Sequence, residues 1–197
     1  CMASLAKNSR MLERNTARAA DLIGHFKQVA VDQSSARRRS FDLRQTVDEM
    51  LVTLVLTFKH TRHRIEVDIP TDLQMDSYPG PLEQVIANLV ANSLAHGFVG
   101  MDEGRVELYA RPLADTHLEL RYTDNGVGIA SETLHRIFEP FFTTHLGQGG
   151  SGLGLYIVYN LVTGVLGGTI EVASSPGGGT VFTLLLPRTA PERGAAA

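Results

Sequence analysis

Residues 124–155 read DNGVGIASETLHRIFEPFFTTHLGQGGSGLGL, and most of what the sequence reveals starts from this stretch. It opens with Asp124, Gly126 and Gly128 in a DxGxG pattern at the end of a predicted strand. Glycines there let the backbone approach a planar ligand, and a strand-end carboxylate can accept a hydrogen bond from an exocyclic amine. The pattern alone is weak evidence, because a β-turn around Asn-Gly contains the same residues.

The stretch ends in a glycine run, residues 147–155, that leads into a predicted helix. Backbone amides free of side chains at a helix start suit an anion such as phosphate. Gly147, Gly149 and Gly152 match the GxGxxG spacing of dinucleotide-binding folds, but no predicted strand precedes them and they lie late in the chain. The sequence also lacks a GxxxxGKS or GxxxxGKT motif, so a P-loop is excluded.

Upstream, apolar residues at helical spacing predict a helix from Pro81 to about Phe98. Asn88, Asn92 and His96 follow one another at intervals of one turn and share one face of this helix. Carboxamide oxygens can coordinate Mg²⁺, a hard cation that prefers oxygen ligands. A solvated helix face explains the same three residues more simply, so this helix by itself does not decide the question.

The other predicted elements favour an α+β fold, a two-layer α/β sandwich, because strands and helices do not alternate strictly. Segments 64–69 and 73–78 are expected to pair as a hairpin. Strands are predicted at 41–43, 64–69, 73–78, 105–111, 117–123, 168–173 and 180–186, and helices at about 47–58, 81–98 and 152–166.

Composition excludes several classes of protein. The chain has 197 residues, of which 43% are hydrophobic and 20% charged, so it is not disordered throughout. Its single cysteine excludes an internal disulfide framework and a multi-cysteine zinc site. A net charge of -3 offers no basic surface for nucleic acid, and the longest apolar run is too short to span a membrane. We expect neither a nucleic-acid partner nor direct membrane contact.

The N-terminal region predicts a long helix followed by a linker. Leu5, Leu12, Ala19 and Phe26 recur every seven residues, as in the seam of a coiled coil. The polar segment SSARRRS at 34–40 then separates this helix from the globular part. A solitary amphipathic helix that packs on its own domain remains the alternative. Because Cys1 precedes Met2, we also expect the sequence to be a fragment of a longer protein.

Five segments, taken in order, resemble the boxes of the GHKL ATPase family, and specifically the ATP-binding catalytic domain of sensor histidine kinases. The resemblance covers about residues 40–187, and the leading helix resembles the second helix of the dimerisation domain in such kinases. It implies a partial dimerisation helix and linker at 1–36, a catalytic domain at 40–187 and a disordered tail at 188–197. The five segments are NLVANSLAHG at 88–97, DNGVG at 124–128, FEPFFTT at 138–144, GGSGLGL at 149–155 and GGGTVFTLLLP at 177–187.

The resemblance implies a role for individual residues. Asp124 would bind the adenine amine, and Thr180 would reach the same edge through water. Asn92 would be the Mg²⁺ ligand, and 138–150 would form a mobile lid over ATP. The residues expected to contact ATP are Asn88, Asn92, His96, Asp124, Gly126, Gly128, Ile129, Gly150, Gly152, Leu153, Gly154 and Thr180.

The sequence also departs from the family pattern. Ala95 and His145 occupy positions where related kinases often carry lysine, which leaves His96 or Arg136 as candidate cations near the γ-phosphate. Asn88 stands where gyrase-type relatives place a glutamate base, so activation of water is poorly supported. No histidine of the chain precedes an acidic residue, as the phosphoacceptor of such kinases does, so the acceptor is expected upstream.

The expected function is therefore to position ATP·Mg²⁺ for phosphoryl transfer to a histidine outside this sequence, and from there to the receiver domain of a response regulator. Homodimerisation through the N-terminal helix and a cytoplasmic location are also expected. The alternatives are an ATP-driven conformational switch, a serine protein kinase of the same superfamily and a degenerate nucleotide-binding scaffold.

Overall fold

The computed structural model describes residues 37–58, 61–143 and 151–192. The predicted dimerisation helix at 1–36 lies outside the described residues, as do Gly150, His145 and the final residues 193–197.

Five strands form one mixed sheet, in the spatial order β2 (Arg64–Asp68), β4 (Arg105–Leu113), β5 (His117–Asp124), β7 (Thr180–Pro187) and β6 (Thr169–Ser174). β2 runs parallel to β4, and the other neighbouring pairs are antiparallel. Every second residue of β5 is buried, because successive side chains of a strand point to opposite faces. This alternation turns both Tyr122 and Asp124 toward the interior.

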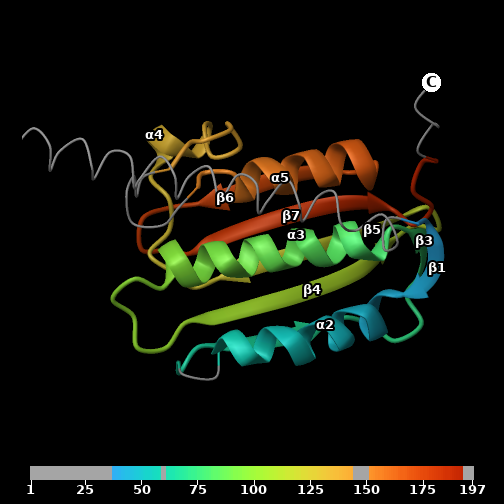
Figure 1. Ribbon diagram of the computed structural model, residues 1–197, viewed down its shortest axis with the longest axis horizontal. Helices are drawn as coiled ribbons and strands as arrows, with labels where there is room; N and C mark the ends of the chain where they lie inside the picture. The colour runs from blue at the N-terminus through green and yellow to red at the C-terminus, as the bar shows by residue number, and fades with distance from the viewer. Residues whose placement is uncertain (1–36, 59–60, 144–150, 193–197) are drawn as a thin grey trace, which may run out of the picture.

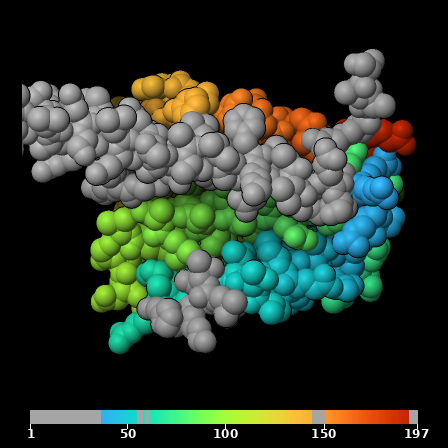
Figure 2. All heavy atoms as spheres, in the orientation of Figure 1, coloured from blue at the N-terminus to red at the C-terminus, as the bar shows by residue number. Residues whose placement is uncertain are grey.

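Three helices, α2 (Leu43–Phe58), α3 (Pro79–Asn92) and α5 (Gly154–Asn160), lie side by side over one face of the sheet (Figure 1). In the space-filling view, α2 (cyan) lies below the green middle part of the chain (Figure 2). The predicted α+β two-layer sandwich is confirmed. The core residues that α3 contributes recur at helical spacing and are Leu82, Val85, Ile86, Leu89 and Val90.

Both α3 and α5 end in a wider π-helical turn, at Ser93–Gly97 and Leu161–Val165 respectively. Single π-helical turns inside or at the end of α-helices are frequent at functional sites. The turn after α3 places Ser93 in the interior, where it is 3% exposed.

The predicted hairpin between 64–69 and 73–78 is wrong. β3 (Gln74–Ser77) pairs antiparallel with β1 (Arg39–Asp42) in a separate two-stranded sheet. β2 instead pairs in parallel with β4, which follows it only after α3 has crossed the sheet. Parallel pairing needs such a long crossover, and two alternating segments that are adjacent in the sequence carry no sign of it.

The disordered tail predicted from residue 188 is wrong for residues 188–192. The N–H of Asp76 donates to the carbonyl of Arg188 at 2.7 Å, and the N–H of Ala190 donates back to Asp76 O at 2.9 Å. Ala190 is buried, and the Tyr78 hydroxyl donates to Pro191 O at 3.0 Å. The segment after β7 therefore lies against β3 as part of the domain.

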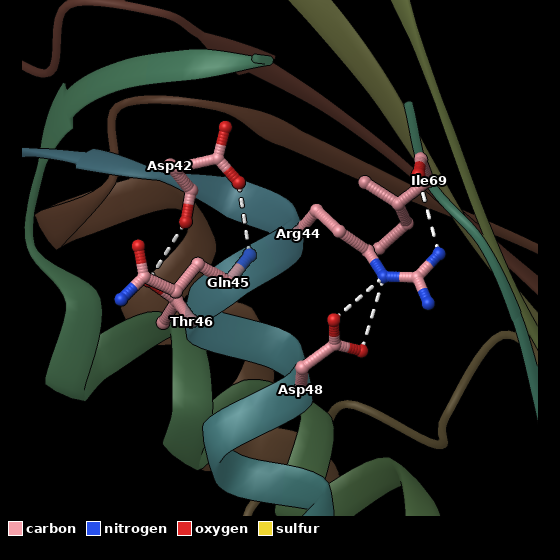
Figure 3. A network of polar contacts seen from close by, with 6 residues as sticks. All are labelled: Asp42, Arg44, Gln45, Thr46, Asp48 and Ile69. Carbon is pink, nitrogen blue, oxygen red and sulfur yellow. Dashed lines mark hydrogen bonds and ion pairs between the residues drawn. The ribbon is translucent and has the colours of Figure 1, made fainter. Parts of the chain in front are cut away.

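Polar contacts join the start of α2 to its surroundings (Figure 3). The carboxylate of Asp42 caps the helix by accepting from the Gln45 N–H at 2.9 Å, a contact worth about 1 kcal/mol. Arg44 forms an ion pair with Asp48 at 2.8 Å, and its Nη1 donates to Ile69 O at 3.4 Å. These bonds connect β1, α2 and the end of β2.

Among the helices of residues 37–58, 61–143 and 151–192, none has both the length and the hydrophobicity of a membrane span.

Candidate functional site

A cavity of about 480 Å³ opens between α3, α5 and the ends of β5 and β7. A further wall comes from residues 127–143, which include the short helix α4 (Ser131–Leu134). Most of the residues that the resemblance assigned to ATP line this cavity: Asn88, Asn92, His96, Asp124, Gly128, Ile129, Gly152, Gly154 and Thr180.

The other three predicted residues do not line it. Gly126 is buried directly beneath the carboxylate of Asp124. Leu153 is buried, at 7% exposure, but is not among the residues of the hydrophobic core. Gly150 is not among the described residues. Direct contact of Gly126 and Leu153 with a ligand is therefore not supported by their positions.

Asp124 ends β5 at the inner wall of the cavity and is 5% exposed. Its Oδ1 accepts a hydrogen bond from the Gly126 N–H at 2.9 Å, and its Oδ2 accepts one from the Ser93 hydroxyl at 2.7 Å. The Ser93 oxygen lies 2.8 Å from the hydroxyl of Tyr122. Burial raises the pKa of Tyr122 well above its ordinary value, the negative charge of Asp124 adds to this, and the Ser93 hydrogen bond opposes it.

Thr180 lies beside Asp124 because β5 and β7 pair with these two residues opposite each other. Its hydroxyl is 3.2 Å from Ser174 Oγ. Ser174 donates to Gly179 O at 2.6 Å and accepts from the Ile129 N–H at 2.8 Å. The end of β6 thus holds the start of β7 and the loop after β5 in place around the carboxylate.

Two glycines of the DxGxG pattern are required by close approaches of the backbone. A Cβ on Gly126 would lie 2.6 Å from Gly97 O and 2.8 Å from Asp124 Oδ1. Gly128 has φ +74, and its Cβ would lie 1.9 Å from Ser175 O. A side chain at Gly126 or Gly128 would therefore displace the loop that forms the base of the cavity.

The far end of the cavity is formed by α3 and the start of α5. A Cβ on Gly154 would lie 3.5 Å from Asn88 Oδ1 and 3.9 Å from Asn92 Oδ1. The amide nitrogen of Asn88 donates to Gln84 O at 2.9 Å, which directs its oxygen toward Gly154. Two carboxamide oxygens therefore border the gap before α5. They fit Mg²⁺ shared with phosphate oxygens, because Mg²⁺ usually takes only one or two protein ligands in such sites.

Lysine and arginine are absent from the described residues that line the cavity, where Asp124 and His96 are the titratable groups. Ala95, at a position where related kinases often carry lysine, also lines it. Arg136 is not among the lining residues; its guanidinium pairs with Glu139 at 2.9 Å and lies 4.6 Å from the centre of the Phe142 ring. Of the two candidate cations, only His96 is at the cavity.

The residues on either side of segment 144–150 are bonded to each other. The N–H of Phe141 donates to Gly152 O at 2.9 Å. Gly152 has φ +67, and a Cβ there would lie 2.6 Å from the carbonyl carbon of Phe141. The predicted lid at 138–150 thus has one contact between Phe141, which lies within it, and Gly152, which follows it.

Ser93, Tyr122 and Ser174 surround the site but were not predicted from the sequence. Ser93 follows Leu89 by four residues, so it is a polar residue at a core-facing position of the predicted helix. Tyr122 shares the inward face of its strand with Asp124. Ser93 and Tyr122 could thus have been identified as inward-facing polar residues from the helix and strand periodicity. No comparable pattern marks Ser174.

Residues 78–190, more than half of the chain, match the protein family described as histidine kinase-, DNA gyrase B-, and HSP90-like ATPase. The chain belongs to this family. In this chain, described residues from several of the predicted boxes line one cavity together with Asp124.

Two curated proteins similar to this chain are named as sensor kinases. Autoinducer 2 sensor kinase/phosphatase LuxQ of Vibrio harveyi is 33% identical over 175 residues, covering 85% of this chain and 20% of LuxQ. Sensor histidine kinase ZraS of Klebsiella oxytoca is 32% identical over 186 residues, covering 93% of this chain and 37% of ZraS. The chain therefore spans less than half the length of either relative.

Solved structures agree with this assignment. The nucleotide-free catalytic domain of histidine kinase ThkA aligns with a TM-score of 0.68 and 25% identity, over 78% of this chain and 97% of that domain. Full-length ShkA in complex with AMPPNP aligns with a TM-score of 0.64 and 25% identity, over 76% of this chain and 31% of ShkA. ThkA in complex with response regulator TrrA shares the fold at a TM-score of 0.67 and 22% identity, over 92% of this chain and 49% of that one.

Proposed function

We propose that the chain is the ATP-binding catalytic part of a sensor histidine kinase, which positions ATP for phosphoryl transfer to a histidine outside this sequence. The observation that carries the proposal is the buried carboxylate of Asp124 at one end of a cavity whose other end is bordered by Asn88 and Asn92. An adenine amine at the first end would leave the phosphates near the second. The relatives named as a sensor kinase/phosphatase and a sensor histidine kinase support the same activity.

At the base end, Asp124 would accept a hydrogen bond from the 6-amino group of adenine. Each carboxylate oxygen already has one donor within the protein, so its orientation is set before the nucleotide arrives. Thr180, which lines the cavity opposite Asp124, would bind a water at the same edge of the base. Apolar side chains, including Ile129 and Phe182, line the cavity around the base.

At the phosphate end, Asn92 would hold Mg²⁺, with Asn88 beside it. The metal would neutralise charge on the phosphates and so lower the barrier to transfer. The backbone at Gly152 and Gly154 would lie next to the phosphates without a side chain between them. A nitrogen of the acceptor histidine would attack the γ-phosphorus, the bond to the bridging oxygen of ADP would break, and ADP would leave.

Hydrolysis is less well supported than transfer to a histidine. Asn88 occupies the position of the base in hydrolytic relatives, and a carboxamide cannot take a proton from water. Among the described lining residues the one carboxylate is Asp124, which lies at the base end. Positioning and charge neutralisation supply most of the catalysis in phosphoryl transfer, so the acceptor's location decides the outcome.

The proposal extends to the whole protein. We infer that the N-terminal heptads dimerise, that the phosphohistidine passes its phosphoryl group to the receiver domain of a response regulator, and that this occurs in the cytoplasm. The likeness of this fold to ThkA in complex with response regulator TrrA supports such a partner.

The test is nucleotide binding to the 197-residue chain, measured by calorimetry with ATP and GTP in the presence of Mg²⁺. We expect ATP to bind and GTP to bind poorly, because the 6-oxo group of guanine presents an acceptor to Asp124. Asp124→Asn should weaken ATP binding by about tenfold to a hundredfold, since hydrogen bonds to charged groups contribute about 1.5–3 kcal/mol. Equal affinities for ATP and GTP would contradict the proposal.

A further inference from the structure

The carboxylate of Asp124 is the last member of a chain of hydrogen bonds that starts in the core. Ser93 has a single hydroxyl proton, and it donates that proton to Asp124 Oδ2 at 2.7 Å. The hydroxyl of Tyr122, 2.8 Å from the Ser93 oxygen, must therefore be the donor in that contact. The direction of the chain is thus Tyr122 to Ser93 to Asp124.

All three members of this chain are shielded from solvent. Tyr122 is 0% exposed, Ser93 is 3% exposed and Asp124 is 5% exposed. The raised pKa of Tyr122 keeps its hydroxyl protonated, so it remains a donor at any pH used for binding. Hydrogen bonds in such surroundings are stronger than in water, and buried members without partners are costly, so the arrangement is held firmly.

The carboxylate is held from two sides. Ser93 comes from the π-helical turn after α3, and Gly126 comes from the loop after β5. Each donates to a different oxygen of Asp124. Rotation of the carboxylate away from the cavity would break at least one of these bonds.

We propose that Ser93 and Tyr122 are positioning residues that set the base specificity of the site by holding Asp124 as a fixed acceptor. The proposal rests on the proposed function, since it requires a purine at this end of the cavity. A 6-amino purine donates to a fixed acceptor. A 6-oxo purine places its own acceptor against the carboxylate, which cannot turn aside while Ser93 and Gly126 hold it. Rejection of the wrong base thus depends on the hydroxyl chain as well as on Asp124.

The test compares adenosine with inosine, which differ at the 6-position and carry no phosphate. Dissociation constants would be measured by calorimetry on the 197-residue chain for the unchanged sequence, Ser93→Ala, Tyr122→Phe and the double variant. Tyr109→Phe is the matched control, because Tyr109 is a half-buried tyrosine of the neighbouring strand β4 that does not line the cavity. Urea unfolding of each variant would report its stability separately.

We expect Ser93→Ala to reduce the adenosine-to-inosine affinity ratio by about tenfold, the size expected for loss of one hydrogen bond to a charged group. Tyr122→Phe should reduce the ratio by less. It should have no further effect in the Ser93→Ala background, because Tyr122 acts only through Ser93. Tyr109→Phe should leave the ratio unchanged.

A purely structural role predicts something different: lower stability, or equal loss of affinity for both nucleosides, with the ratio intact. That result, or additive effects of the two substitutions on the ratio, would overturn the proposal. If Ser93→Ala does not fold, an unchanged ratio in Tyr122→Phe overturns it alone. If the unchanged chain binds neither nucleoside and no ATP, the proposed function fails instead; if it binds ATP, the same ratio is measured with ATP and ITP.

Discussion

Gly154 and Asn88 approach each other so closely that a Cβ on Gly154 would lie 3.5 Å from the Asn88 side-chain oxygen. That distance is an ordinary van der Waals contact, so the protein alone would tolerate a methyl group at this point. The methyl group would, however, occupy the gap between α3 and α5 where we place the phosphates. A substitution of Gly154 by alanine can therefore affect nucleotide binding without affecting folding.

Gly154→Ala should therefore leave the free energy of unfolding unchanged or raise it, by up to about 1 kcal/mol, because alanine is the better helix former. The affinity for ATP with Mg²⁺ should fall by about tenfold, while the affinity for adenosine stays the same. Gly164→Ala is the control, since a Cβ there would meet no atom within 4 Å outside its own helix. Equal losses for ATP and adenosine would place the phosphates elsewhere.

Asn92→Ala should lower the affinity for ATP much more in the presence of Mg²⁺ than in EDTA. The physical reason is that the lost oxygen would be a metal ligand, and binding without the metal does not use it. Calorimetric titration of ATP under both conditions measures the difference. Equal losses in the two titrations would mean that Asn92 supports the fold or the nucleotide directly and does not hold the metal.

The ion pair between Arg38 and Asp76, 2.5 Å apart, predicts a pH dependence. The hydrogen bond and charge of Arg38 lower the pKa of Asp76, against a smaller opposing effect of desolvation. A carboxylate whose folded pKa is depressed stabilises the protein above its unfolded pKa, and this contribution is lost as the pH falls through the folded value.

Arg38→Ala should accordingly reduce the urea midpoint slightly at pH 7, and this difference should shrink as the pH is lowered through the acid range. Both groups are partly exposed, so the effect should also weaken with added salt. Arg37→Ala, one residue away and exposed, is the matched control. A deficit that is constant with pH would show that Arg38 acts through packing.

Incubated alone with γ-labelled ATP, the chain should bind nucleotide yet show neither stable autophosphorylation nor appreciable hydrolysis. None of its seven histidines precedes an acidic residue, and a bound γ-phosphoryl group without an in-line nucleophile does not react. Adding a helix that carries the acceptor histidine required by the proposed function should produce acid-labile, base-stable label, as expected for phosphohistidine. Strong label on His25, or rapid hydrolysis, would favour a conformational-switch ATPase or another acceptor.

Much of the site could be predicted from the sequence because its parts are local. The spacing of Asn88 and Asn92 places both on one helix face, and the DxGxG pattern places Asp124 at a strand end before a tight loop. The core-facing periodicity of the strands and of α3 was confirmed for the same reason. Periodicity depends only on the geometry of one helix or one strand.

Pairing between distant segments was decided by the tertiary structure. β3 pairs with β1 instead of β2, and residues 188–192 lie against β3. The partner of a strand depends on which strand edges the whole fold brings beside it, and no single segment encodes this. The hydrogen bonds from Tyr122 through Ser93 to Asp124 likewise join a helix end to a strand.

By itself, the sequence determined which residues of this protein have the chemistry to bind a nucleotide, since carboxylate, carboxamide and glycine positions are set within single elements. Only the tertiary structure decided which of them meet. Asp124 and Thr180 are neighbours through the β5–β7 register, and Gly154 reaches Asn88 because α5 packs on α3. Burial of apolar side chains in the shared core holds those elements together. The free energy of this burial arises only when the segments pack against one another, so no single segment determines it.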